Sequence, residues 1–378
     1  RGFGRFEFIG KRLGRYLPIV LLTPAQQHEV IDNRFELRPL RGVSLISELA
    51  ISRLDRNQYS SLNDEDNTGR AWLAALQVDK QKLRFGKTAL GELDLQLRYR
   101  NKSERYRDID RSDVVEFDRR WNLSSSSKNR GEEILESALN YAPITGWRWH
   151  AGLGSLRRGI EQNSSRWEIG TVLQHKRWPE LKYQIESIAR EEGRTVDSKW
   201  LRQRGNLNWS LWKLRPQFGY EAEDRKDAMV DSTGGFRFES VTAGLAVEMR
   251  RGLRFSFSQN ERRDEARNAR GLLPKSVANT QSYALHVEQW KNLTLGLNYT
   301  HRERKFEDAK FGNDARTDLA DVQAQYSPLR RALTTDLHYQ ITNTQAAKQE
   351  RVFFQVPRGE GNYRFETTLN DYVPDPVF

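Results

Sequence analysis

Apolar and polar residues alternate along much of this chain with the two-residue period of a β-strand rather than the spacing of a helix. In residues 93–99, leucine or tyrosine occupies every odd position and a polar residue every even one. The runs 293–299 and 337–341 repeat this pattern, with glycine at one of the even positions. Such strands have one apolar and one hydrated face. The pattern therefore predicts an all-β protein of antiparallel strands.

Turn sequences divide the chain into hairpins. Tight turns are predicted at 39–42, within 80–90, and at 143–146, 178–181, 212–216, 250–253, 290–293 and 328–331. Longer polar loops are predicted near 158–164, 193–198, 226–235, 266–276 and 307–315, and residues 106–131 are read as one long loop. Val114 to Trp121, inside that loop, looks extended and could form a strand. An up-and-down meander of roughly 16–18 strands follows, each about 11–16 residues long.

Composition favours a barrel over a bundle of membrane helices. The mean hydropathy is -0.81, and no run of about 18 apolar residues exists. A transmembrane β-barrel needs only about five apolar residues in each strand. The 62 basic and 51 acidic residues are interleaved, so no nucleic-acid partner is expected. The absence of cysteine excludes disulfides and thiolate metal sites.

The two ends of the chain share a Gly-aromatic pattern. Residues 1–8 read RGFGRFEF and residues 358–365 read RGEGNYRF. We therefore expect a hairpin module at 1–33, the barrel meander at 34–357 and a second module at 358–378. A repeated module would make the barrel part of a larger one, and chance similarity is the alternative. Because Arg1 replaces an initiator methionine and no leader is visible, a processed or excised chain is expected.

Aromatic residues fit two membrane interfaces about 20 Å apart. One group lies at predicted turns and the other seven to nine residues further along the strands: Trp178, Trp212 and Trp290, and Tyr99, Tyr299 and Tyr339. With its short turns, long loops and alternating strands, the chain resembles the outer-membrane β-barrel class over residues 34–357. Residues 116–122 and the Gly-rich ends are also similar to large barrels of the type-9 secretion translocon kind.

This resemblance implies an outer-membrane location in a diderm bacterium, contact with outer-membrane lipid, and other envelope proteins as candidate partners. The polar face of the strands would then line a lumen. The candidate lumen-facing residues are Arg98, Arg148, Glu168, Glu186, Glu248, Glu288, Asp336 and His338. Their charges could tune solute selectivity or tie neighbouring strands together through ion pairs.

Catalytic chemistry finds little support in the sequence. The six histidines do not fall at metal-ligand spacing, and we expect no enzyme activity and no cofactor. Asp64, Glu65 and Asp66 could bind Ca²⁺, although such a run is more often a solvated loop. The predicted function is a passive pore, conduit or structural envelope protein. The alternatives are a soluble extracellular β-protein that binds glycan or another macromolecule, and a barrel enzyme that uses His286 or His338.

Overall fold

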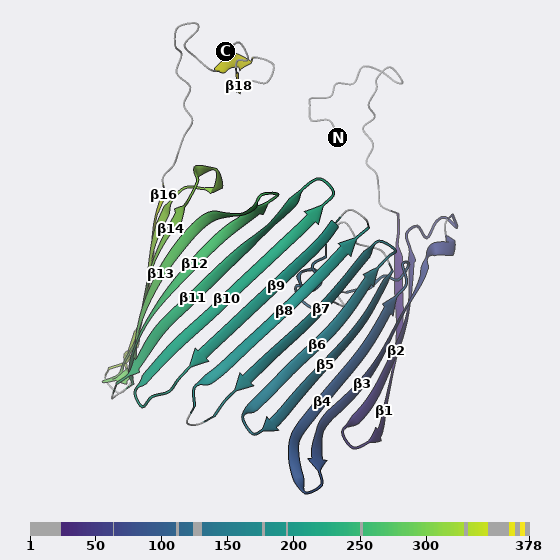
Figure 1. The fold of residues 1–378 in the computed structure, drawn as a ribbon, viewed down its shortest axis with the longest axis horizontal. Helices are drawn as coiled ribbons and strands as arrows, with labels where there is room; N and C mark the ends of the chain where they lie inside the picture. The colour runs from purple at the N-terminus through teal and green to yellow at the C-terminus, as the bar shows by residue number, and fades with distance from the viewer. Residues whose placement is uncertain are drawn as a thin grey trace. The chain divides into compact units, whose positions relative to one another are not determined.

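The computed structural model describes residues 24–62, 64–110, 113–123, 131–175, 178–193, 196–249, 252–328, 332–346, 363–366 and 371–374. Sixteen antiparallel strands form one sheet in which each strand lies beside the next in the chain (Figure 1). Strands β17 and β18 form a separate hairpin. The predicted all-β, up-and-down meander is confirmed.

The strands of the large sheet are 12 to 20 residues long. Their bounds are β1 Gln27–Leu40, β2 Val43–Asp55, β3 Thr68–Phe85, β4 Thr88–Lys102, β5 Glu132–Ile144, β6 Trp147–Arg158, β7 Gln162–Leu173, β8 Glu180–Glu192, β9 Val196–Asn208, β10 Leu214–Met229, β11 Thr233–Glu248, β12 Leu253–Asn268, β13 Gly271–Trp290, β14 Leu293–Phe306, β15 Ala315–Tyr326 and β16 Thr335–Ala346. The hairpin comprises β17 Tyr363–Glu366 and β18 Asp371–Pro374. Within the described ranges, the short helical turns are η1 Asp64–Asp66, α1 Phe117–Arg120 and η3 Ala309–Phe311.

The chain divides into two compact units. Unit 1 comprises residues 1–173, 184–201 and 227–231, and unit 2 comprises the remaining residues. Residue 33, where the N-terminal module is predicted to end, lies inside β1. Residues 1–23 lie outside the described residues, so most of that predicted module has no structural description.

In unit 1, the strand register separates two faces. Leu97 pairs with Ser137, which pairs with Leu153, which pairs with Trp167. Leu153 is 65% exposed, so this row forms an uncovered apolar face. The adjacent row joins Arg98, Glu136, Gly154 and Arg166 on the opposite, polar face.

Unit 2 has the same two faces. Phe257, Tyr283 and Tyr299 are register partners on the apolar face, with ring centroids 5.0 and 6.1 Å apart. Leu337 and Tyr339 continue this face on β16 and are more than half exposed. Apolar side chains exposed on every second residue match strands whose outer face meets lipid rather than a second sheet.

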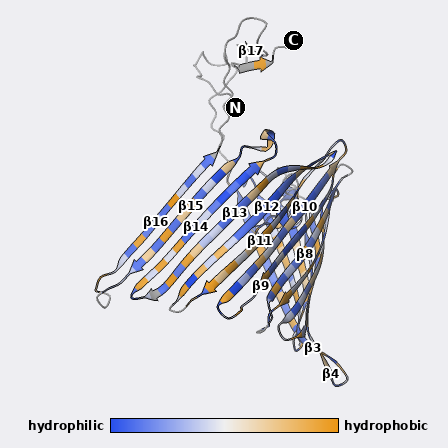
Figure 2. Cartoon of the chain, turned by 60° about the vertical axis from the view of Figure 1, so that its left-hand side comes forward, coloured by the Kyte–Doolittle hydropathy of each residue, from blue (hydrophilic) through white to orange (hydrophobic). Residues whose placement is uncertain are grey.

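The apolar face occupies only one half of the strands. We call the half of each strand that lies away from the β13–β14 turn the far half. After Tyr299, the positions on the same face of β14 are His301 and Glu303. Figure 2 shows the consequence, since orange residues recur in the lower parts of β13–β16 and their upper ends are mostly blue.

Most of the predicted long loops are wrong, because the strands continue through this polar half. Four are instead short connections between extended strands, at 159–161, 193–195, 230–232 and 269–270. Polar residues occupy both faces of the strands there, so the alternation ends although the backbone ladder continues. The loop near 307–315 is confirmed at close to its predicted length, as residues 307–314, and the long loop predicted at 106–131 corresponds to the connection between β4 and β5. The tight turns at 41–42, 145–146 and 291–292 lie within their predicted ranges.

Candidate constriction on the polar face

A long connection between β4 and β5 folds back onto the polar face of unit 1. Its described residues, 103–110 and 113–123, are called the inner segment below. The prediction that Val114 to Trp121 could form a strand is wrong, because the chain turns there into the helix α1. Glu116, just before α1, has a left-handed φ of 61°, which breaks the extended path.

Trp121 anchors the inner segment. Its side chain is 1% exposed and belongs to a small core with Phe117, Ile134 and Leu156. It lies over Gly154 of β6, where a Cβ atom would come within 2.7 Å of the indole ring. The missing side chain of Gly154 thus leaves the space that the indole fills. Removing such a buried tryptophan typically costs about 3–5 kcal/mol.

Hydrogen bonds hold the end of the inner segment. The Ser164 hydroxyl donates to the carbonyl oxygen of Trp121 at 2.7 Å. The Asn122 amide donates to Ser198 Oγ, also at 2.7 Å, and the Ser198 hydroxyl donates in turn to Asp227. Because Asn122 and Ser198 are buried, breaking this chain would leave polar groups without partners.

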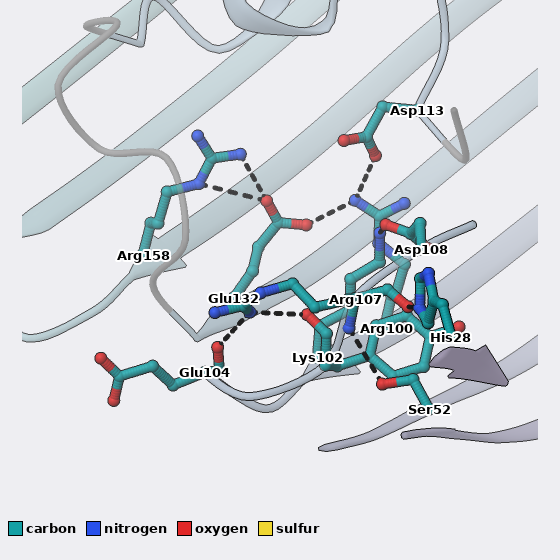
Figure 3. A network of polar contacts seen from close by, with 11 residues as sticks. His28, Ser52, Arg100, Lys102, Glu104, Arg107, Asp108, Asp113, Glu132 and Arg158 are labelled. Atoms are coloured by element: carbon teal, nitrogen blue, oxygen red, sulfur yellow. Dashed lines mark hydrogen bonds and ion pairs between the residues drawn. The ribbon is translucent and has the colours of Figure 1, made fainter. Parts of the chain in front are cut away.

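Two arginines and one carboxylate surround the start of α1. The guanidinium groups of Arg100 and Arg158 lie 5.5 and 5.6 Å from the centre of the Phe117 ring. Both pair with the buried carboxylate of Glu132 (Figure 3), and Arg100 also contacts Asp113 at 2.8 Å. Ion pairs and cation–π contacts therefore fix Phe117 from several strands.

The first part of the inner segment lies over β1–β3. The Arg107 amide donates to the buried Ser52 hydroxyl at 3.0 Å, and Lys102 pairs with Asp108 at 2.9 Å (Figure 3). The backbone of Tyr106 passes so close to Gly69 that a Cβ there would lie 2.1 Å from the Tyr106 nitrogen. Burial, and then the charges of Asp108 and Asp32, raise the pKa of Tyr106. Its phenol therefore stays protonated at neutral pH.

Three predicted lumen-facing residues of unit 1 lie near the inner segment: Arg98, Glu168 and Glu186. Arg98 is 4.0 Å from Glu136, which also pairs with Arg120 of α1 at 3.0 Å. Glu168 accepts hydrogen bonds from His150 and Arg166, each at 2.8 Å, and the Glu186 carboxylate lies 3.7 Å from Arg166. The fourth predicted residue of unit 1, Arg148, lies on β6 opposite Val172 of β7. The sequence pattern did not identify Phe117, Trp121 or Glu132, although glycines at 152 and 154 inside a strand signal close approach by another group.

The other four line the polar face of unit 2. Glu288, Asp336 and His338 border an open hollow of about 780 Å³, together with Arg254 and His286. His338 lies 3.0 Å from Asp321. Glu248 pairs with Arg215 and Arg254 at 3.0 and 2.9 Å. This face is open and carries charges of both signs.

The predicted aromatic girdle residues are solvent-accessible. Trp178, Trp212 and Trp290 are exposed at turns, and Trp212 is 87% exposed with Lys213 4.5 Å over its ring. Tyr99 and Tyr299 share the apolar face with the leucines of their strands, as does Tyr339. Further tryptophans that the sequence reading did not assign are also exposed on the apolar face: Trp72, Trp149 and Trp167. Trp72 packs on Tyr99, with 4.6 Å between ring centroids.

Metal and catalytic candidates gain no support. Asp64, Glu65 and Asp66 form the exposed turn η1, and the described part of the chain contains no group of three His, Asp or Glu residues placed to hold a metal ion. His338 has a carboxylate partner, but the geometry described for it includes no nucleophile within hydrogen-bond reach. No helix in the described ranges is long and apolar enough to cross a membrane.

Comparisons with known proteins give structural likeness only. No protein-family model and no curated protein matches the chain. A bacterial polysaccharide outer membrane secretin is similar at a TM-score of 0.33 and 11% identity, covering 85% of this chain and 91% of its own. OccD3 (OpdP) of Pseudomonas aeruginosa is similar at a TM-score of 0.32 and 10% identity, and the match covers 86% of this chain and 87% of OccD3. OmpT of Vibrio cholerae is similar at a TM-score of 0.30 and 7% identity, and the match covers 86% of this chain and 99% of OmpT. Solved structures similar to the chain thus include outer-membrane proteins, the class that the sequence resembles.

Proposed function

We propose that the chain forms an outer-membrane β-barrel that acts as a passive conduit, narrowed by its inner segment. The observation that carries this proposal is the division of long strands into an exposed apolar face and a charged polar face. Leu153 and Leu337 are more than half exposed, whereas Glu132 and Arg158 lie on the other side of the sheet. Lipid covers exposed leucines of this kind in a barrel, and water fills a polar interior.

The inner segment is a fixed constriction rather than a mobile plug. Trp121 is buried against Gly154, and Phe117 is held between the two arginines that share Glu132. Displacing the segment would expose both rings and remove the contacts of Arg100 and Arg158 with the Phe117 ring. Solutes therefore pass beside a rigid constriction, and the conduit needs no opening step.

Cell fractionation and heat-modifiability test the location. We expect the protein in the outer membrane, and a compact band on a gel that shifts when the detergent extract is boiled. Recovery as a soluble species without detergent would contradict the barrel and favour the soluble binding protein.

Planar-bilayer recording tests the constriction. The wild type should give steady currents, because the inner segment is docked. The double variant Phe117→Ala/Trp121→Ala should give a larger or fluctuating current, and Trp212→Ala, which alters an exposed turn residue, should behave as the wild type. Identical currents from all three proteins would show that the inner segment does not limit the conduit.

A further inference from the structure

A small hollow lies beside α1 on the polar face of unit 1. It measures about 160 Å³ and is bordered by Arg98 of β4, Arg120 of α1 and Arg166 of β7. Two carboxylates, Glu136 and Glu168, border it as well. We call it the arginine hollow. Three guanidinium groups from three different elements thus face a space with only two carboxylates.

The carboxylates are already engaged by neighbouring groups. Glu136 pairs with Arg120 at 3.0 Å, whereas its contact with Arg98 is long, at 4.0 Å. Glu168 accepts from His150 through one oxygen and from Arg166 through the other. Donors on Arg98 and Arg120 therefore remain available, and both side chains are about two-fifths exposed.

Arg166 provides an independent signal for a ligand. Its side chain is 6% exposed, and its Nη1 atom is buried with no hydrogen-bond partner among the described residues. A buried guanidinium N–H without an acceptor is costly, and Arg166 borders the hollow, so a small shift of its side chain would bring this N–H to an oxygen atom bound there. Guanidinium groups bind carboxylate and phosphate oxygens with well-matched, often bidentate geometry.

We propose that the arginine hollow binds one oxyanion group of a passing solute, a carboxylate, phosphate or sulfate. This inference rests on the proposed conduit and names its solute class. At about 160 Å³, the hollow has room for one such group but not for a whole large solute. The solute would thus be held by a single anionic group while the rest stays in the lumen.

Bilayer recording with the full chain tests the inference, with inorganic phosphate, sulfate and acetate added in separate arms to distinguish the oxyanions. The wild type should favour anions over cations, and at least one oxyanion should reduce the current in a saturable way. Arg120→Gln should weaken that block roughly tenfold or more, the loss expected for a hydrogen bond to a charged group. Glu136→Gln should strengthen it, because a competing negative charge is removed.

Arg119→Gln is the matched control, because Arg119 is the neighbouring residue, equally exposed, and lies over Trp200 rather than in the hollow. Its block should equal that of the wild type. Isothermal titration of detergent-solubilised protein with inorganic phosphate repeats the comparison without any current. Steady currents that no oxyanion blocks, or equal effects of Arg119→Gln and Arg120→Gln, would overturn the arginine hollow and leave the conduit intact. An absence of current, with phosphate still bound in the titration, would contradict the conduit and leave the anion site in the arginine hollow intact.

Discussion

The polar faces of the two units differ although their strands follow the same pattern. In unit 1 the inner segment covers part of the face, and Trp121 and Glu132 become buried there. In unit 2, His286 and His338 border an open hollow. The difference arises from one long connection rather than from the strands. The strands supply a wall with two faces, and the connection determines where that wall is constricted.

The largest difference between the units should appear when a carboxylate is removed. Glu132→Ala leaves two arginines facing each other in a buried site and should cost about 3–5 kcal/mol. Glu288→Ala removes an exposed carboxylate from the hollow of unit 2 and should cost at most about 0.5 kcal/mol. The urea midpoint of the detergent-solubilised protein measures both. Equal midpoints would mean that the inner segment is not held by Glu132.

A glycine substitution sharpens the same comparison. Gly154→Ala places a Cβ 2.7 Å from the Trp121 ring and should destabilise by about 1–3 kcal/mol, because the indole must shift. Gly234→Ala in β11 meets no atom within 4 Å and should be neutral or slightly stabilising. Tryptophan fluorescence should shift to the red only for Gly154→Ala. An unshifted spectrum with unchanged stability would place Trp121 elsewhere.

The smallest effect is expected for an exposed ion pair. Arg34 and Glu48 lie 2.6 Å apart across β1 and β2, but the Arg34 side chain is more than half exposed. Arg34→Ala should therefore change the free energy of unfolding by about 0–1 kcal/mol. A double-mutant cycle with Glu48→Ala measures the pair, and a coupling of several kcal/mol would show that this edge is far less hydrated than its exposure indicates.

The sequence predicts the strands where one face is apolar. The alternation of Leu93 to Tyr99 and of Leu293 to Tyr299 falls inside β4 and β14. Prediction fails in the far half of the strands, where residues such as Arg157 and Lys226 continue a ladder that hydropathy no longer marks.

Most of the inner segment was predicted as part of a long loop, but its anchors were not predicted. Trp121 is buried only because Gly154, distant in the sequence, leaves room for it. Glu132 gains its role from Arg100 and Arg158 on the neighbouring strands. Such groupings depend on register, and alternation within one strand does not specify which residues face each other across the sheet.

Quenching of tryptophan fluorescence by brominated lipid tests the central claim that the apolar face meets lipid and the polar face does not. The chain has ten tryptophans, so variants that retain one each report on single positions. In vesicles, a variant retaining Trp167, which lies on the apolar face, should be strongly quenched, and one retaining Trp121 should keep its fluorescence. Equal quenching of the two, or no quenching of Trp167, would contradict the assignment of the faces.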